Sequence, residues 1–136
     1  MPGAQALVHW QFCEAVSMGE LNRVSGKLGE VRAEQVLLEK GYEILARNVV
    51  CPGAEIDLIA KDGEVIVFAE VKMRTRGIAG REAVTPAKQK RICKGAVYYL
   101  MRNGLMNRQA RFDVIEIQGE RVTHIADAFP YQGPAF

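Results

Sequence analysis

Three ionisable residues in the middle of the chain, Asp57, Glu70 and Lys72, have the types and spacing of a metal-dependent hydrolytic site. Twelve residues separate Asp57 from Glu70, and Lys72 follows two positions later. Carboxylate oxygens are preferred ligands of Mg²⁺ and Mn²⁺. Such a cation would polarise a phosphoryl oxygen and generate the attacking hydroxide. Lys72 would orient or deprotonate the attacking water, or stabilise the charge that develops on a phosphate.

The elements that must position these residues have clear start and stop signals. Segments rich in β-branched and aromatic residues predict five strands, at residues 42–50, 54–61, 64–74, 112–117 and 121–125. Ser25 is a candidate N-cap for a helix over 25–40, and Thr85-Pro86 opens a second helix that runs to about residue 102. The third strand, the second helix and the fourth strand form a crossover, so these two strands should be parallel.

The predicted architecture is an α/β fold with a mixed sheet of four to five strands flanked by helices. We expect one domain at residues 23–129 and an irregular tail at 130–136. Residues 1–22 carry a weak helical stripe, so a leading helix and a loosely docked arm both fit this segment.

The register of the second and third strands decides which acids share a face. A two-residue turn at Asp62-Gly63 predicts Glu55 opposite Glu70, with Asp57 a diagonal neighbour of Glu70. Because side chains alternate along a strand, Glu55, Asp57, Glu70 and Lys72 should project from the same face.

A structural role explains this acidic face poorly. Like charges on facing strands destabilise a sheet, and each buried carboxylate costs several kcal/mol unless compensated. A bound divalent cation would offset both effects. The alternative is a solvated face, where ion pairs contribute under about 1 kcal/mol each. Against it, Ile59, Ile66 and Phe68 fall on the same face and should not cluster in solvent.

Ordered motifs along residues 25–129 resemble the bacterial YraN family. They are Gly29-Glu30-x-x-Ala33, Gly41-Tyr42-x-Ile44-Leu45-Ala46-Arg47-Asn48, Glu55-Ile56-Asp57-Leu58-Ile59, Phe68-x-Glu70-Val71-Lys72-x-Arg74, Ala83-Val84-Thr85-Pro86-x-Lys88-Gln89, Arg111-Phe112-Asp113-Val114 and His124-Ile125-x-x-Ala128-Phe129. Asp57 with Glu70-x-Lys72 also resembles the D…(D/E)-x-K signature of the PD-(D/E)XK nuclease superfamily. This resemblance implies a restriction-endonuclease-like sheet.

The endonuclease-like assignment of that family rests on similarity to archaeal Holliday junction resolvases. There, a helix glutamate, an aspartate and an E-x-K pair form the metal site, and Glu30, Asp57, Glu70 and Lys72 match them. The resemblance implies an endonuclease that uses Mg²⁺ or Mn²⁺ and cleaves DNA, branched or junction DNA included, and it implies a homodimer. The alternative for Glu30 is an exposed first-turn acid favoured by the helix dipole.

A basic segment follows the proposed site. Eight of the 18 Lys and Arg residues fall within 23 positions: Lys72, Arg74, Arg76, Arg81, Lys88, Lys90, Arg91 and Lys94. Such a patch could neutralise phosphates, and the lack of a base-reading motif favours recognition of DNA shape or backbone. Gln89 and Lys88, on the first turn of the second helix, could reach the acid site. Gln89 and Glu55 are secondary candidates. The alternative is a charge-rich solvated surface.

Composition excludes several other classes. Three widely spaced cysteines without a C-x-x-C motif argue against a disulfide framework or a zinc site. Neither a signal peptide nor a membrane span is expected, so the predicted location is the cytoplasm. Two other functions stay open: an accessory nucleic-acid-binding protein with little or no catalysis, and a structural partner that docks through residues 1–22 or the aromatic tail.

Overall fold

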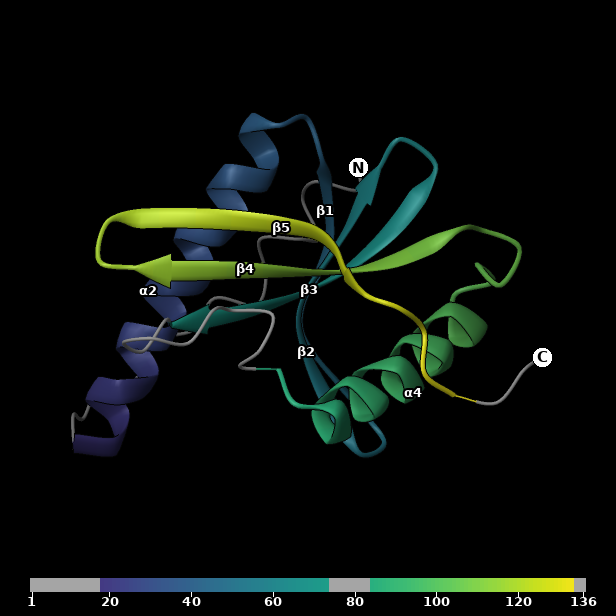
Figure 1. Cartoon of the computed structure of the whole chain (residues 1–136), viewed down its shortest axis with the longest axis horizontal. Helices are drawn as coiled ribbons and strands as arrows, with labels where there is room; N and C mark the ends of the chain where they lie inside the picture. The colour runs from purple at the N-terminus through teal and green to yellow at the C-terminus, as the bar shows by residue number, and fades with distance from the viewer. Residues whose placement is uncertain (1–17, 74–83, 134–136) are drawn as a thin grey trace.

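The computed structural model describes the backbone of residues 18–73 and 84–133, and the side chains of residues 28–73 and 84–133. Five strands form one sheet in the order β1-β2-β3-β4-β5, and two helices flank it (Figure 1). The elements are α2 (Met18–Glu39), β1 (Glu43–Cys51), β2 (Ala54–Asp62), β3 (Val65–Met73), α4 (Pro86–Arg102), β4 (Ala110–Gln118) and β5 (Arg121–Phe129). Only the β3–β4 pair is parallel. The predicted α/β class with a mixed sheet is confirmed.

The helices begin and end at different kinds of signal. Thr85 caps α4 as predicted, because its hydroxyl accepts a hydrogen bond from the Lys88 N–H at 3.2 Å. At the end of α2, Gly41 adopts a φ of 89°, which glycine tolerates without strain. The prediction that Ser25 begins this helix is wrong, because α2 begins at Met18 and runs through it. Serine is only mildly unfavourable inside a helix.

The β2–β3 register differs from the predicted one by two residues. Asp62 pairs with Val65 and Leu58 with Ala69, so Asp57, the next residue out, lies opposite Glu70. The predicted pairing of Glu55 with Glu70 is therefore wrong. Its cause is the turn, which uses Gly63 and Glu64 and leaves Asp62 in the strand. Because side chains alternate with period two, a shift of two preserves the shared face and makes Asp57 a direct cross-strand neighbour of Glu70.

Strand β5 is longer than predicted and ends at Phe129 rather than residue 125. The β4–β5 register shifts between Phe112 and Val114, and Asp127 adopts a φ of 53°. This irregularity lets the strand continue until Phe129 stacks on Phe112, with ring centroids 5.1 Å apart.

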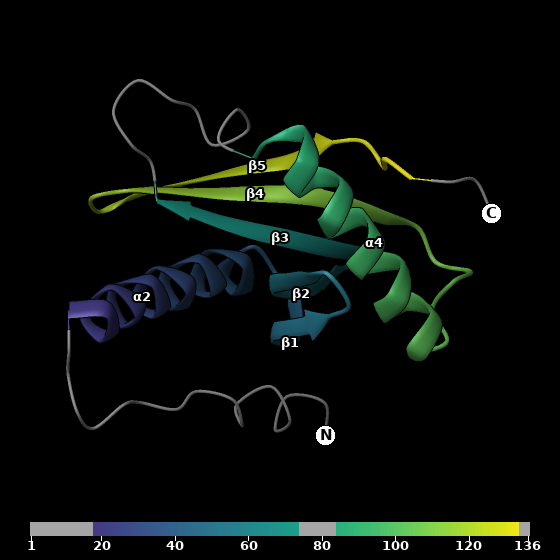
Figure 2. The same cartoon turned by 90° about the horizontal axis from the view of Figure 1, so that it is seen from below.

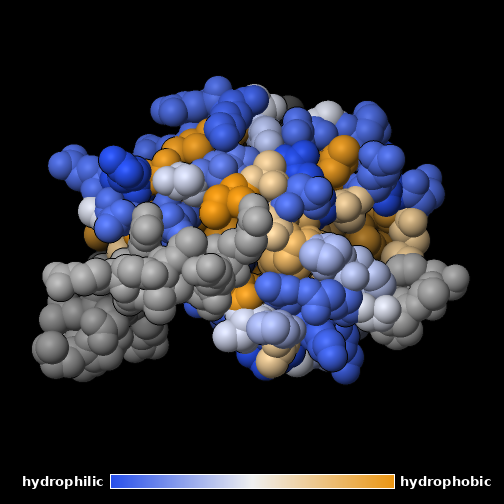
Figure 3. All heavy atoms as spheres, viewed as in Figure 1, coloured by the Kyte–Doolittle hydropathy of each residue, from blue (hydrophilic) through white to orange (hydrophobic). Residues whose placement is uncertain are grey.

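Two apolar layers hold the helices on opposite faces of the sheet (Figure 2). Ile92 and Leu100 of α4 belong to the cluster that includes Phe68. Leu37 of α2 belongs to the other cluster, with Val67. On the face shown in Figure 3, pale and orange residues are visible between α4 and the sheet, among hydrophilic ones. Neither described helix combines the length and apolar character needed to cross a bilayer.

Candidate active site

The centre of the candidate site is a pair of carboxyl groups on adjacent strands. Glu70 of β3 is buried, and Asp57 of β2 is partly buried. The backbone N–H of Val71 donates a hydrogen bond to Asp57 Oδ2 at 2.8 Å. The Glu70 side chain is close enough to Asp57 for its negative charge to raise the pKa of the Asp57 carboxyl.

This environment shifts the acidity of Asp57. Burial, followed by the charges of Glu70 and Glu30, raises the pKa of Asp57 from 3.8 to about 8, although the Val71 N–H acts in the opposite direction. At neutral pH, the Asp57 carboxyl therefore retains its proton. A divalent cation would remove the reason for that proton, because it stabilises both ionised carboxylates.

The donor set fits Mg²⁺ or Mn²⁺ through two ligands rather than three. Among the described residues, no group of three or more His, Cys, Asp and Glu side chains is placed to hold a metal ion. Mg²⁺ usually takes only one or two carboxylates and retains several waters, so Asp57 and Glu70 satisfy its needs. Their oxygen donors also match the preference of this hard cation.

Glu30 approaches the pair from α2. Its charge contributes to the raised pKa of Asp57, and it is partly buried. The alternative of an exposed first-turn acid is wrong, because α2 begins twelve residues earlier, at Met18. Gly29 permits the close approach of the helix: a Cβ there would lie 3.2 Å from Ile117 Cδ1 and 3.4 Å from Met73 Sδ.

Lys72 lies two residues beyond Glu70 on β3 and is partly exposed. In the parallel β3–β4 pair it stands opposite Glu116, which is buried. The alternation of strand side chains puts Lys72 on the Glu70 face, as the sequence predicts. Its role in catalysis stays a prediction.

Lys88 reaches the acid pair, as its position on the first turn of the second helix suggested. Its Nζ lies 2.6 Å from Glu70 Oε2. Burial lowers the pKa of Lys88, but its hydrogen bond to Glu70 and the charges of Glu70 and Asp57 outweigh that effect and raise it. The signal for this contact was the Thr85 N-cap, which places Lys88 on the first turn of α4, close to where the crossover leaves β3.

The other residues predicted for the site do not contact the acid pair in any described interaction, or lie outside the described residues. Lys90, Arg91 and Lys94 are exposed on α4, and Glu55 is exposed on β2. The side-chain amide of Gln89 donates to the Val84 carbonyl at 2.8 Å and pairs with Gln132, so it holds the start of α4 to the segment after β5. Arg74, Arg76 and Arg81 lie outside the described residues.

A second buried polar cluster was missed entirely. Asp113 is fully buried and accepts hydrogen bonds from Arg111 Nε at 3.0 Å, His124 Nε2 at 2.6 Å and the Asp127 N–H at 2.9 Å. Lys40 Nζ donates to His124 Nδ1 at 2.8 Å, so Nε2 carries the proton that is donated to Asp113. These bonds tie the residue after α2 to β4 and β5.

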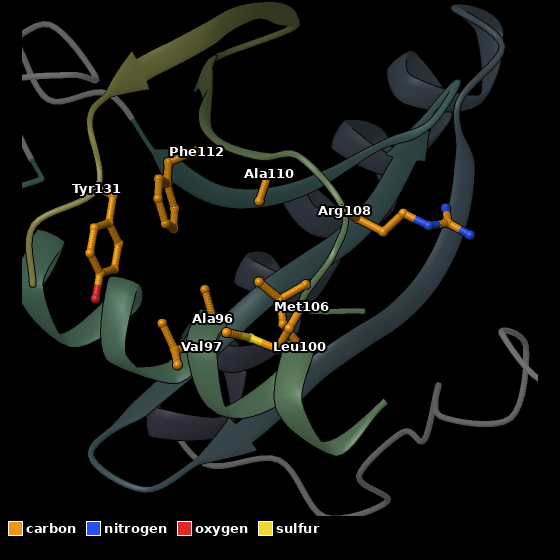
Figure 4. A pocket seen from close by; sticks show the side chains of 8 residues that line it. All are labelled: Ala96, Val97, Leu100, Met106, Arg108, Ala110, Phe112 and Tyr131. Atoms are coloured by element: carbon orange, nitrogen blue, oxygen red, sulfur yellow. The ribbon is translucent and has the colours of Figure 1, made fainter. Parts of the chain in front are cut away.

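A pocket with a volume of about 250 Å³ lies between α4 and β4, and neither Asp57 nor Glu70 lines it (Figure 4). Its lining is largely apolar: Ala96, Val97, Leu100, Met106, Arg108, Ala110, Phe112 and Tyr131. Because its lining residues include no carboxylate and Arg108 is the one charged residue among them, it offers no anionic ligand for a cation.

Comparison with known proteins places the chain in a family. The model of the uncharacterised protein family UPF0102 matches residues 29–117, more than half of the chain. This chain belongs to the UPF0102 family. A UPF0102 protein of Geobacter sulfurreducens is 42% identical over 115 residues, covering 79% of this chain and 90% of the relative. UPF0102 proteins of Alkalilimnicola ehrlichii and Symbiobacterium thermophilum are 45% and 47% identical, covering 80% and 72% of this chain and 89% and 85% of those relatives.

The UPF0102 match contains the whole candidate site, since it begins one residue before Glu30 and extends past α4 and most of β4. Strand β5 and the segment that packs on α4 through Gln132 lie beyond it. The acid pair and Lys88 thus belong to the part of the chain that the family model covers.

Proposed function

We propose that this UPF0102 protein is a nuclease that hydrolyses phosphodiester bonds in DNA with the help of Mg²⁺ or Mn²⁺. The observation that carries the proposal is the acid pair: Asp57 and Glu70 stand opposite each other on adjacent strands, in surroundings that raise the pKa of Asp57 to about 8. Burying two acids together opposes folding, and a cation-binding role explains why the chain keeps them.

Asp57 and Glu70 would hold the divalent cation, with Glu30 adding negative charge from α2. When bound, the cation would supply Lewis-acid polarisation of the phosphate and activation of water. The Val71 N–H fixes the Asp57 carboxylate through a 2.8 Å hydrogen bond, which limits its rotation before a substrate arrives. Lys72 would stabilise the charge that develops on the phosphate, or orient or deprotonate the attacking water.

The exposed face of α4 would contact the DNA backbone. Lys90, Arg91 and Lys94 are exposed there, on the helix whose first turn carries Lys88 to Glu70. Phosphate contacts position a protein without reading sequence, so cleavage should depend on DNA shape more than on base order. Branched DNA is the first shape to test, and a homodimer would suit a substrate with two symmetric strands.

The deciding experiment compares cleavage of linear duplex, single-stranded and four-way branched DNA with added Mn²⁺ or Mg²⁺. We expect metal-dependent cutting that falls by roughly a hundredfold or more in Asp57→Asn and Lys72→Ala. Glu55→Gln is the matched control, because Glu55 is exposed on the same strand. Cutting that persists in Asp57→Asn would refute the proposed role of the acid pair.

An accessory role in nucleic-acid binding, with little or no catalysis, is the second candidate function. It is favoured by the Lys88–Glu70 ion pair, which already neutralises one acid. It is also favoured because, among the described residues, no group of three potential metal ligands is placed to hold a cation. This function predicts salt-dependent DNA binding that survives Glu70→Gln, with no metal-dependent cutting of any of the three substrates.

A further inference from the structure

Lys88 provides the acid pair with a positive charge from within the chain. Its Nζ lies 2.6 Å from Glu70 Oε2, and the Glu70 side chain is only 5% exposed. The charge of Asp57 also acts on Lys88. One ammonium group therefore stands where the two acids need a cation.

From this geometry we infer that Lys88 and a divalent cation compete for the acid pair, and that cation binding releases the Lys88 ammonium to a phosphate of the nucleic acid. The inference rests on the proposed function and adds a step to it: metal entry and phosphate capture become coupled. Both positive charges would otherwise share the Oε2 oxygen of Glu70, where they repel each other.

The local structure allows the Lys88 side chain to move while its backbone stays in place. Its N–H is held by the Thr85 hydroxyl in the N-cap of α4, so the helix need not shift. The side chain is 33% exposed, unlike that of Glu70, and its flexible stem can reach solvent. Three exposed basic residues of the same helix, Lys90, Arg91 and Lys94, would attract a phosphate backbone toward it.

An opposite role for Lys88 gives an opposite prediction. If Lys88 instead held Glu70 in the correct orientation for a cation, removing Lys88 would weaken metal binding. If it competes with the cation, removing it strengthens metal binding. The sign of the change in affinity therefore distinguishes a competitor from a positioning residue.

The experiment measures Mn²⁺ affinity of the full chain at pH 7.5, from the electron paramagnetic resonance signal of free Mn²⁺ and from titration calorimetry. We expect Lys88→Met to bind Mn²⁺ about tenfold more tightly than wild type, because a nearby positive charge is lost. Lys88→Arg keeps the charge and should stay within about threefold of wild type. Arg102→Met, which removes an exposed positive charge from the last turn of the same helix, is the control and should leave the Mn²⁺ affinity unchanged.

A second measurement tests the release of Lys88. DNA binding is followed against salt concentration in EDTA and in Ca²⁺, which takes oxygen ligands as Mg²⁺ does. For wild type, the slope of log affinity against log salt should steepen by about 0.9 in Ca²⁺, the value of one added phosphate contact. Lys88→Met should show no such steepening. Equal slopes in wild type would overturn the release step.

The outcomes separate this inference from the proposed function. If wild type binds Mn²⁺ and Lys88→Met binds it equally or less tightly, the competition is overturned and the nuclease proposal stands. Tighter binding by Lys88→Met, in a protein that cuts no DNA, supports the competition and refutes the nuclease. Absence of Mn²⁺ binding by wild type overturns both.

Discussion

Removing the charge of Asp57 should make the protein more stable, and increasingly so as the pH rises. In Asp57→Asn the amide oxygen can still accept the Val71 N–H, while the repulsion by Glu70 and Glu30 disappears. The native protein retains the Asp57 proton up to a pH of about 8, whereas the unfolded chain loses it near 3.8. Wild-type stability therefore falls as the pH rises through this window, and the loss is complete above pH 8.

The magnitude follows from the size of that window. Moving a pKa from 3.8 to about 8 corresponds to an upper limit of roughly 6 kcal/mol. Asp57 is only partly buried, so solvent screens part of the repulsion, and we expect a gain nearer to about 2 kcal/mol at pH 9. For a chain of this size, that gain would raise the melting temperature by roughly 6–10 °C.

The assay is chemical and thermal unfolding of wild type, Asp57→Asn and Glu55→Gln at pH 5, 7 and 9. The gain of Asp57→Asn over wild type should grow from pH 5 to pH 9. Glu55→Gln, which alters an exposed acid of the same strand, should stay within about 0.5 kcal/mol of wild type at every pH. A gain that does not change with pH, or a loss of stability at pH 9, would refute the reasoning.

Three further perturbations test other parts of the fold and site. Asp113→Asn should lower the free energy of unfolding by about 3 kcal/mol, since it removes the buried charge that pairs with Arg111 and accepts the hydrogen bond from His124. Burial raises the pKa of Asp113, but the hydrogen bonds to its carboxylate lower the pKa by more, so the net pKa lies below the ordinary value of 3.8. The ionised Asp113 therefore stabilises the fold above pH 3.8, and this stabilisation should be lost as the pH falls through the lowered pKa. Urea unfolding from pH 7 to pH 2 measures this loss. Gly29→Leu should cost about 1–3 kcal/mol, because even a Cβ would lie 3.2 Å from Ile117 Cδ1, and calorimetry would show it as a lower melting temperature. Lys90→Ala with Lys94→Ala should weaken DNA binding and reduce the salt slope by roughly 1.8 if both contact phosphates; an unchanged slope would remove α4 from the interface.

The acid pair could be predicted from the sequence even though its register could not. The turn expected at Asp62-Gly63 forms one position later, at Gly63 and Glu64, and this moves the strand register by two residues. The error did not move Asp57 to the other face, since the side-chain period of a strand is two. Hydrophobic alternation along the strand thus determines which face of the sheet carries Asp57, whereas the turn determines which residue of β3 lies opposite it.

Contacts between distant segments could not be predicted. The Lys88–Glu70 ion pair depends on how α4 lies over the sheet, and the first-turn position of Lys88 does not determine that distance. The hydrogen bonds of Asp113 join residues from the end of α2 and from two strands. No local pattern marks such a cluster, because each member is an ordinary polar residue within its own segment.

The position of α2 connects these long-range contacts to the chemistry. Arg47 is buried in β1 and donates to Glu34 Oε1 at 2.6 Å, and Lys40 contacts His124 after the helix ends. Both contacts lie on the C-terminal side of Glu30, so they anchor the helix from that direction. Because the charge of Glu30 helps to raise the pKa of Asp57, a displacement of α2 would change the acidity of a residue on another element. Asp57 and Glu70 are thus placed by β2 and β3, but the proton affinity of Asp57 also depends on how α2 is held against the sheet.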